Sequence, residues 1–212
     1  FRENANIINV FTNNFGKVSG IVYGGNSRKI RNYLQLSNKI LVFHNSKNQN
    51  RIGYFKTELI EAISPKYFND KKKTSALISL TSLLNILLPD SQSYKNVYLS
   101  LENLIKNFNN SQWIILYIYW ELNLIKELGF DTNLRKFKKN DIKSNQILNL
   151  DIDGTIYQTP QFLISDSTNE EVDNNSIKKG LVFTRNIMMN KFFMPNNLTF
   201  PRSRVILENY FI

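Results

Sequence analysis

The 212-residue chain contains no cysteine and a single histidine, His44. Without cysteine there are no disulfides, thiolate zinc sites or cysteine nucleophiles, and one histidine excludes any site that needs two. We therefore expect no metal site and no cofactor. No apolar run approaches the ~18 residues of a membrane-spanning helix. The chain opens Phe1-Arg2-Glu3 without Met or a signal-peptide pattern. We expect a soluble, cytoplasmic protein with further residues before Phe1.

Acidic residues are scarce in the first third of the chain. Residues 1–66 hold ten basic and three acidic residues, which is +7 of the total formal charge of +10. Residues 17–57 hold no acid and eight cations: Lys17, Arg28, Lys29, Arg31, Lys39, Lys47, Arg51 and Lys56. Arginine forks match phosphate oxygens, and the Gly24-Gly25 pair before Arg28 allows a loop to approach a phosphate closely. Because this segment has no anion of its own, the pattern indicates a polyanionic partner.

The first 65 residues predict β-strands with short connections. Alternating and β-branched segments favour strands at residues 4–11, 17–23, 34–44 and 52–63. With one more strand upstream, they suit a small five-stranded barrel. Five aromatic residues are interleaved with the cations, as stacking on nucleic-acid bases requires: Tyr23, Tyr33, Phe43, Tyr54 and Phe55. We nevertheless expect most of them to fill the barrel, and we expect His44 to be a packing or surface residue.

After Pro65 the apolar spacing becomes helical. The predicted helices cover residues 74–88, 94–108, 112–128, 177–193 and 202–210, with Ser111 and Ser176 as N-caps and Gly129 as a helix stop. Two short β segments, 146–152 and 155–164, are joined at Asp153-Gly154. The expected fold class is α+β: a nucleic-acid-binding barrel at residues 1–65, then a mainly helical domain at residues 66–212. A small β insert lies at about residues 131–173.

One motif suggests an enzyme. Asp151-Ile152-Asp153-Gly154-Thr155 is similar to the signature of phosphatases that use an aspartyl nucleophile and Mg²⁺. Too few residues follow it to build the α/β core that such chemistry needs, and an Asp-Gly hairpin turn explains the same pattern. We therefore expect no catalytic residues.

Several segments, in order, resemble the RecO family of bacterial recombination mediators. In the first third they are Ile8 to Thr12, Phe15 to Val18, Gly24 to Lys29 and Leu34 to Asn38. Further along, Trp120 to Leu124 with Leu128-Gly129-Phe130 resembles the family's central helix, and Pro201 to Leu207 its final helix. The resemblance implies an OB-fold, its first strand truncated here, followed by a helical domain.

The resemblance also implies a function. Such proteins bind single- and double-stranded DNA, anneal complementary strands, contact the C-terminal acidic tail of the single-stranded-DNA-binding protein, and act with RecR to load RecA. It implies DNA contact at Lys17, Arg28, Lys29 and Arg31, and we extend this from charge to Lys39, Lys47 and Arg51.

Two features depart from the family pattern. Relatives that bind zinc carry cysteines in the insert, where this chain has Phe137, and many have an arginine where this chain has Tyr119. An OB-type RNA-binding or ribosome-associated module without annealing activity remains the alternative.

Overall fold

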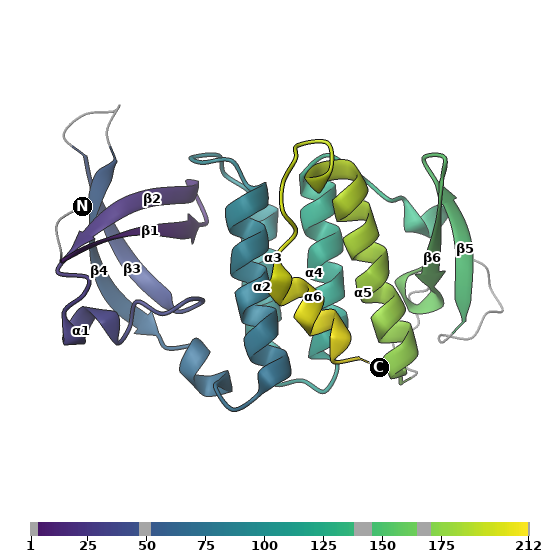
Figure 1. Cartoon of the computed structure of the whole chain (residues 1–212), viewed down its shortest axis with the longest axis horizontal. Coiled ribbons are helices and arrows are strands. Elements are labelled where there is room, and N and C mark those ends of the chain that lie inside the picture. Colours follow the sequence, from purple (N-terminus) through teal and green to yellow (C-terminus); the bar gives the residue numbers. More distant parts are fainter. Residues whose placement is uncertain (1–3, 47–51, 138–145, 165–170, 212) are drawn as a thin grey trace. The chain divides into compact units, whose positions relative to one another are not determined.

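The computed structural model describes residues 4–46, 52–137, 146–164 and 171–211 (Figure 1). The chain divides into two compact units, Phe1–Lys95 and Asn96–Ile212, each treated by itself below. Strands dominate the first part of the chain and helices the rest, so the α+β class is confirmed. The domain boundary expected between residues 65 and 66 stays a prediction.

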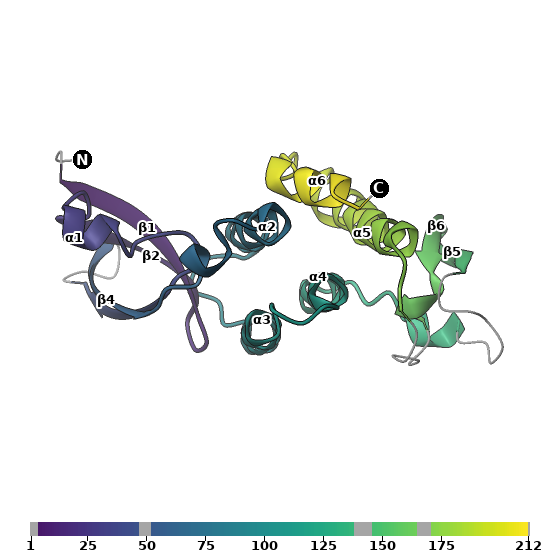
Figure 2. The same ribbon diagram turned by 90° about the horizontal axis from the view of Figure 1, so that it is seen from below.

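Four strands form one sheet in the first unit: β1 (Ala5–Thr12), β2 (Gly16–Tyr23), β3 (Lys39–Asn45) and β4 (Gly53–Glu61). Their order is β1-β2-β4-β3, with antiparallel outer pairs and a parallel central pair. The sheet curls strongly, as Figure 2 shows for β1 and β4. Within the described residues the sheet stays open and no closed barrel forms.

The third strand is shorter than the sequence pattern predicts. It begins at Lys39 rather than at residue 34, because the preceding segment turns at Ser37, which has φ 67°. The side chain of Asn38 then accepts hydrogen bonds from the backbone N–H groups of Ile63 and Ser64, at 2.8 and 3.1 Å. These bonds tie the turn to the end of β4.

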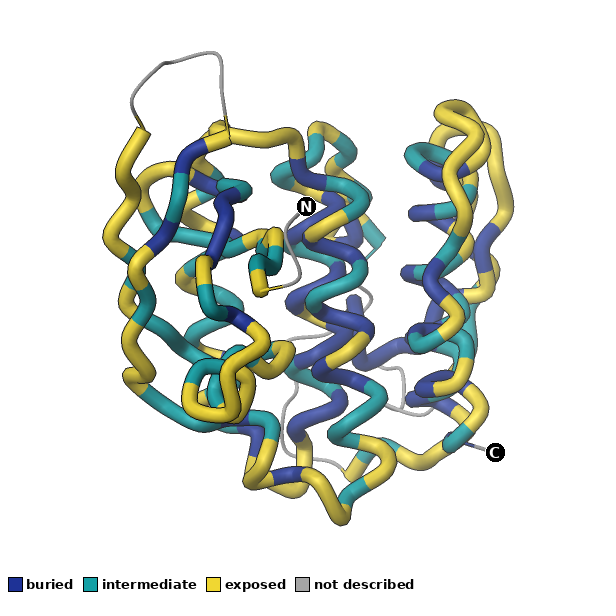
Figure 3. The backbone as a smooth tube through the Cα atoms, turned by 60° about the vertical axis from the view of Figure 1, so that its left-hand side comes forward, coloured by how far each residue is buried: buried dark blue, intermediate teal, exposed yellow. Residues whose placement is uncertain are grey.

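Two helices belong to the first unit. The short helix α1 (Arg28–Arg31) stands where the sequence predicts a loop, because Ser27 caps its N-terminus and its Oγ accepts from the Ile30 N–H at 3.5 Å. Helix α2 (Lys71–Leu87) begins at Asp70, whose carboxylate accepts from the Lys73 N–H at 3.0 Å. Buried residues recur along α2, as expected from its apolar sequence (Figure 3).

The second unit contains α3 (Lys95–Lys106), α4 (Trp113–Glu127), α5 (Asn174–Met188) and α6 (Arg202–Asn209). Two predicted N-caps are wrong. Gln112 rather than Ser111 precedes α4, and Asp173 rather than Ser176 caps α5, its carboxylate accepting from the Ser176 N–H at 2.6 Å. An aspartate three residues earlier reaches the same free N–H groups, so α5 starts sooner.

The predicted stop of α4 is confirmed. Gly129 has φ 99°, and its N–H bonds to the Lys126 carbonyl while the next N–H bonds to the Ile125 carbonyl. This is a Schellman motif, in which a residue with positive φ satisfies the last carbonyls of a helix.

The second unit also contains a hairpin of β5 (Ile147–Ile152) and β6 (Thr155–Pro160). Its turn residues Asp153 and Gly154 both have positive φ, and the Asp151 carboxylate accepts from the Gly154 N–H at 2.9 Å. The Asp151–Thr155 motif is thus a hairpin turn, as its Asp-Gly pair predicts. In the part of the chain that the structure describes, no helix is long and apolar enough to cross a membrane.

Candidate nucleic-acid interface

We call the face of the curled sheet that carries Val22 and Phe55 the buried face, and the face that carries Tyr23 and Phe43 the open face. Neither is uniform, since Ile21 on the open face is 7% exposed and Leu59 on the buried face is 44% exposed. On the buried face, Val22 and Phe55 are 2% and 4% exposed. A Cβ on Gly20 would lie 2.4 Å from the Phe55 ring, and one on Gly53 would lie 2.2 Å from His44 Nε2. Both glycines are therefore needed for these rings to lie against the sheet. His44 is exposed but its ring lies 5.3 Å from that of Phe55 between centroids, in agreement with the prediction of a packing or surface residue.

The open face presents aromatic side chains at the end of β2. Tyr23 is 60% exposed and Phe43 is 53% exposed. Tyr54 lies in the same area, since its ring centroid is 6.2 Å from that of Tyr23. Phe43 pairs with Lys56 across β3 and β4. Tyr23 lies on the same face of β2 as Ile21, which is paired with Tyr54 of β4.

The expectation that most of the aromatic residues fill the interior is wrong for Tyr23 and Phe43. Of the five, Phe55 alone is fully buried. Tyr33 is partly buried, and its hydroxyl donates to the Thr57 carbonyl at 2.8 Å. The segment Lys39–Asn45 is apolar at consecutive positions, so its sequence lacks the alternation that separates a buried from an open face. The pairing of β3 with β4 decides which side Phe43 takes.

The three cations of α1 follow Tyr23 in the chain after a turn of four residues. Arg28, Lys29 and Arg31 are all exposed, and among the described residues none of them forms a salt bridge. A tight turn joins the helix to Tyr23, with the Ser27 N–H bonded to the Gly24 carbonyl at 2.8 Å. The sequence prediction that these three act together is therefore compatible with the local geometry, although they sit on a helical turn rather than on a glycine loop.

Lys17 is placed differently from the α1 cations. It lies at the start of β2, six residues and so about 20 Å along the strand from Tyr23. Its ammonium group is 3.2 Å from Asp90 Oδ1 and donates to the Asn85 carbonyl at 2.7 Å, and its side chain is 15% exposed. The expectation that the cations of residues 17–57 have no internal partner is wrong here, because the fold brings an acid from beyond α2 to Lys17.

The remaining predicted contacts are scattered. Lys39 pairs with Glu61 in the strand register, and both Lys66 and Lys39 lower the pKa of Glu61, with Lys66 the stronger cause. Lys47 and Arg51 lie outside the described residues. The structure therefore brings together the α1 cations and leaves Lys17 and Lys39 beside acids that follow the acid-free segment in sequence.

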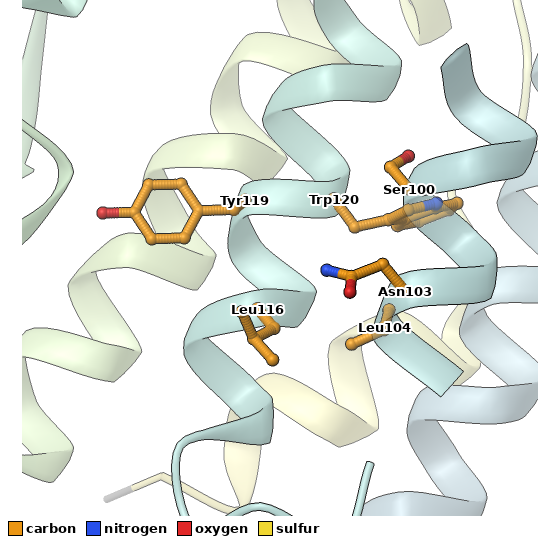
Figure 4. Close-up of a pocket in the computed structure, with 6 residues that line it drawn as sticks. All are labelled: Ser100, Asn103, Leu104, Leu116, Tyr119 and Trp120. Atoms are coloured by element: carbon orange, nitrogen blue, oxygen red, sulfur yellow. The ribbon is translucent and has the colours of Figure 1, made fainter. Parts of the chain in front are cut away.

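The second unit has a small cavity of its own. It measures about 110 Å³ and lies between α3 and α4, lined by Ser100, Asn103, Leu104, Leu116, Tyr119 and Trp120 (Figure 4). The lining includes no charged side chain. Tyr119 points away from the other residues and its hydroxyl donates to the Phe162 carbonyl at 2.7 Å. The indole N–H of Trp120 is buried and has no hydrogen-bond partner among the residues that the structure describes.

Taken together, the chain is a mixed α+β protein with a basic aromatic sheet face in one unit and a helical second unit. Two family descriptions match it: "Recombination protein O N terminal" over residues 1–63 and "Recombination protein O C terminal" over residues 69–184. The chain belongs to the RecO family.

Individual relatives agree with this assignment. The chain is 30% identical to the DNA repair protein RecO of Roseobacter denitrificans over 129 residues, covering 60% of this chain and 54% of the relative. It is 29% identical to the protein of that name from Rickettsia canadensis, covering 92% of this chain and 85% of the relative. It is 28% identical to the DNA repair protein RecO of Rickettsia peacockii, and the match covers 98% of this chain and 91% of the relative. The chain thus spans about half of the first relative and most of the two rickettsial ones.

Proposed function

We propose that this protein is a DNA-binding recombination mediator that anneals complementary single strands in recombinational DNA repair. The observation that carries the proposal is the group of three exposed cations on α1, which among the described residues have no acidic partner, in a chain of the RecO family. The relatives are named DNA repair proteins. The first 65 residues would form an OB-type fold, and residues 66–212 the helical domain.

The mechanism rests on phosphate neutralisation. Arg28, Lys29 and Arg31 would neutralise the phosphates of two strands, which lowers their mutual repulsion so that base pairing nucleates. The remaining predicted contacts at Lys17, Lys39, Lys47 and Arg51 would extend the track. When the logarithm of the single-strand binding constant is plotted against the logarithm of the salt concentration, each neutralised phosphate contributes about −0.7 to the slope. We call this slope the salt slope.

A charge-removal series tests the DNA contact. Replacing Arg28, Lys29 and Arg31 by Ala should weaken single-strand affinity and flatten the salt slope by about 2, one contact for each cation. The matched control replaces Lys106, Arg135 and Lys136, three exposed cations of the second unit, and removes the same charge. An unchanged slope in the α1 variant, or an equal change in the control, would refute the assignment.

An annealing assay separates the proposal from an RNA-binding or ribosome-associated module. The full chain should accelerate pairing of complementary DNA strands coated with the cognate single-stranded-DNA-binding protein. A protein that binds DNA or RNA without accelerating pairing would support the alternative.

The proposed partners are RecR, with which the protein would load RecA, and the acidic C-terminal tail of the single-stranded-DNA-binding protein. We place the tail on the helical unit, where the cavity between α3 and α4 is lined by Leu104 and Leu116 together with the polar side chains of Ser100 and Asn103. Titration of the full chain with a tail peptide should change tryptophan fluorescence, and an absence of binding near millimolar peptide would count against this partner.

A further inference from the structure

The open face of the sheet carries more exposed aromatic surface than folding requires. Tyr23 and Phe43 lie on the side opposite Phe55, and Tyr54 lies beside Tyr23. Tyr23 lies on β2, Tyr54 on β4 and Phe43 on β3, and β4 lies between the other two strands in the sheet. Burial of these rings would stabilise the chain, so their exposure needs another explanation.

The charge around the rings selects one kind of occupant. Lys56 is exposed and is paired with Phe43 across β3 and β4, and the three α1 cations follow Tyr23 after a four-residue turn. One exposed acid, Glu58, lies on this face opposite Leu41. Flat rings beside cations are complementary to unpaired bases joined by phosphates, whereas a duplex keeps its bases stacked inside.

We propose that Tyr23, Tyr54 and Phe43 form a base-stacking site for single-stranded nucleic acid. This inference rests on the proposed DNA binding and deepens it: the α1 cations bind phosphates of either strand form, and the three rings discriminate in favour of unpaired bases. Lys56 holds a phosphate between the two exposed rings. During annealing, bases stacked on this face are kept from pairing within their own strand and are accessible to a complementary strand.

The test compares single-strand and duplex affinity in the full chain. Tyr23→Ala and Phe43→Ala should each weaken binding of oligo-dT by about 5-fold to 150-fold, the range for loss of one stacked base, and leave duplex affinity within about twofold. Tyr23→Phe should retain wild-type affinity, because the ring and not the hydroxyl stacks. Both side chains are exposed, so neither truncation opens a cavity.

Leu41→Ala is the matched control, since Leu41 lies on the same face of β3 and is 42% exposed but has no ring. It should leave oligo-dT affinity unchanged. As a second probe, an abasic oligonucleotide of equal length should bind wild type and Tyr23→Ala alike, because it offers phosphates without bases.

The outcomes separate this inference from the proposed function. If wild type binds no DNA, the proposed function fails. If wild type binds and Tyr23→Ala and Phe43→Ala bind oligo-dT equally well, the stacking site alone is refuted. Equal losses on single strand and duplex, or equal loss in Leu41→Ala, would also refute it. A wild-type dimer that Tyr23→Ala converts to a monomer in light scattering would show that the face pairs with a second copy, which overturns the proposal.

Discussion

The arginines of α1 and Arg204 of α6 differ in almost everything but their charge. Arg28 and Arg31 are exposed, and within the described residues no acid pairs with them. Arg204 is completely buried; its Nε donates to Glu121 Oε1 at 2.5 Å, and its Nη2 donates to Glu121 Oε2 at 3.0 Å and to the Leu181 carbonyl at 2.7 Å. A guanidinium in water is available to a ligand, whereas one enclosed by acceptors holds the fold together.

The surroundings of Arg204 keep it charged. Burial by itself lowers the pKa of a guanidinium, but Glu121, Tyr117 and Glu208 outweigh that cost and raise the pKa of Arg204 above its ordinary value. The Thr184 hydroxyl completes the group by donating to Glu121 Oε2 at 2.5 Å. The network joins α4, α5 and α6 within the second unit, so it has a structural role. The exposed α1 cations, which pair with no acid in the described part of the chain, suit binding.

Removal of Arg204 should have the largest effect on stability. Arg204→Met leaves the Glu121 carboxylate buried and unpaired, and should lower the free energy of unfolding by about 3–5 kcal/mol in urea denaturation. Arg202→Ala on the same helix and Arg28→Ala on α1, both exposed, should change it by less than about 0.5 kcal/mol. The double variant Glu121→Leu with Arg204→Met should recover part of the loss. A loss in Arg204→Met no larger than in Arg202→Ala would contradict the structural role.

A smaller effect is expected at the hydroxyl of the same network. Thr184→Val removes one hydrogen bond to a buried carboxylate and should cost about 1.5–3 kcal/mol. The control is Thr81→Val on α2, where the partly buried hydroxyl donates to carbonyls of its own helix. That change should stay within about 0.5 kcal/mol. Equal losses of unfolding free energy in the two variants would show that the hydrogen bond from Thr184 to Glu121 does not stabilise the fold.

Substitution of Asp90 would remove the ion pair that Lys17 forms. Asp90→Asn removes the acid beside Lys17, and should steepen the salt dependence of single-strand binding by up to about 0.7, one further phosphate contact. The free energy of unfolding should change by less than about 1 kcal/mol, since the side chain of Asp90 is well exposed. Adding Lys17→Gln should abolish this increase and bring the slope to the wild-type value or below it, since Lys17 is itself one of the proposed contacts. If Asp90→Asn leaves the slope unaltered, Lys17 is no DNA contact.

The smallest effect concerns the dependence of stability on pH. The Asn133 N–H, at 2.9 Å, and Lys126, at 3.2 Å, hold the pKa of Asp131 below its ordinary value of 3.8. A lowered folded-state pKa means that this stabilisation is present above the unfolded value and is lost as the pH falls through the folded value. Asp131→Asn should therefore flatten the decline of unfolding free energy below about pH 4. A decline as steep as in wild type would disprove this coupling.

Much of the fold was predictable because each element carries its own local signal. The Asp153-Gly154 turn and the Gly129 stop follow from residues that adopt positive φ, and apolar periodicity locates every long helix. The errors concern competition between neighbouring groups: Asp173 caps α5 in place of Ser176, and Ser27 nucleates a helical turn where glycines suggested a loop.

The candidate site was predictable only in part. The cations at residues 28, 29 and 31 are grouped in the sequence and stay grouped in space. The acids that meet Lys17 and Lys39 could not be foreseen, because Asp90 and Glu61 come from segments outside the acid-free stretch. Arg204 is a similar case: its position in a short helix shows nothing of Glu121, 83 residues away.

The sequence alone determined the basic first third, the absence of cysteine chemistry, the α+β class and the resemblance to one family. These depend on composition and on contacts between near neighbours. Tertiary structure alone decided which cations are neutralised, which arginine is buried, and which face of the sheet exposes Tyr23 and Phe43. Burial and ion pairing depend on strand register and helix packing, which join residues far apart in the chain.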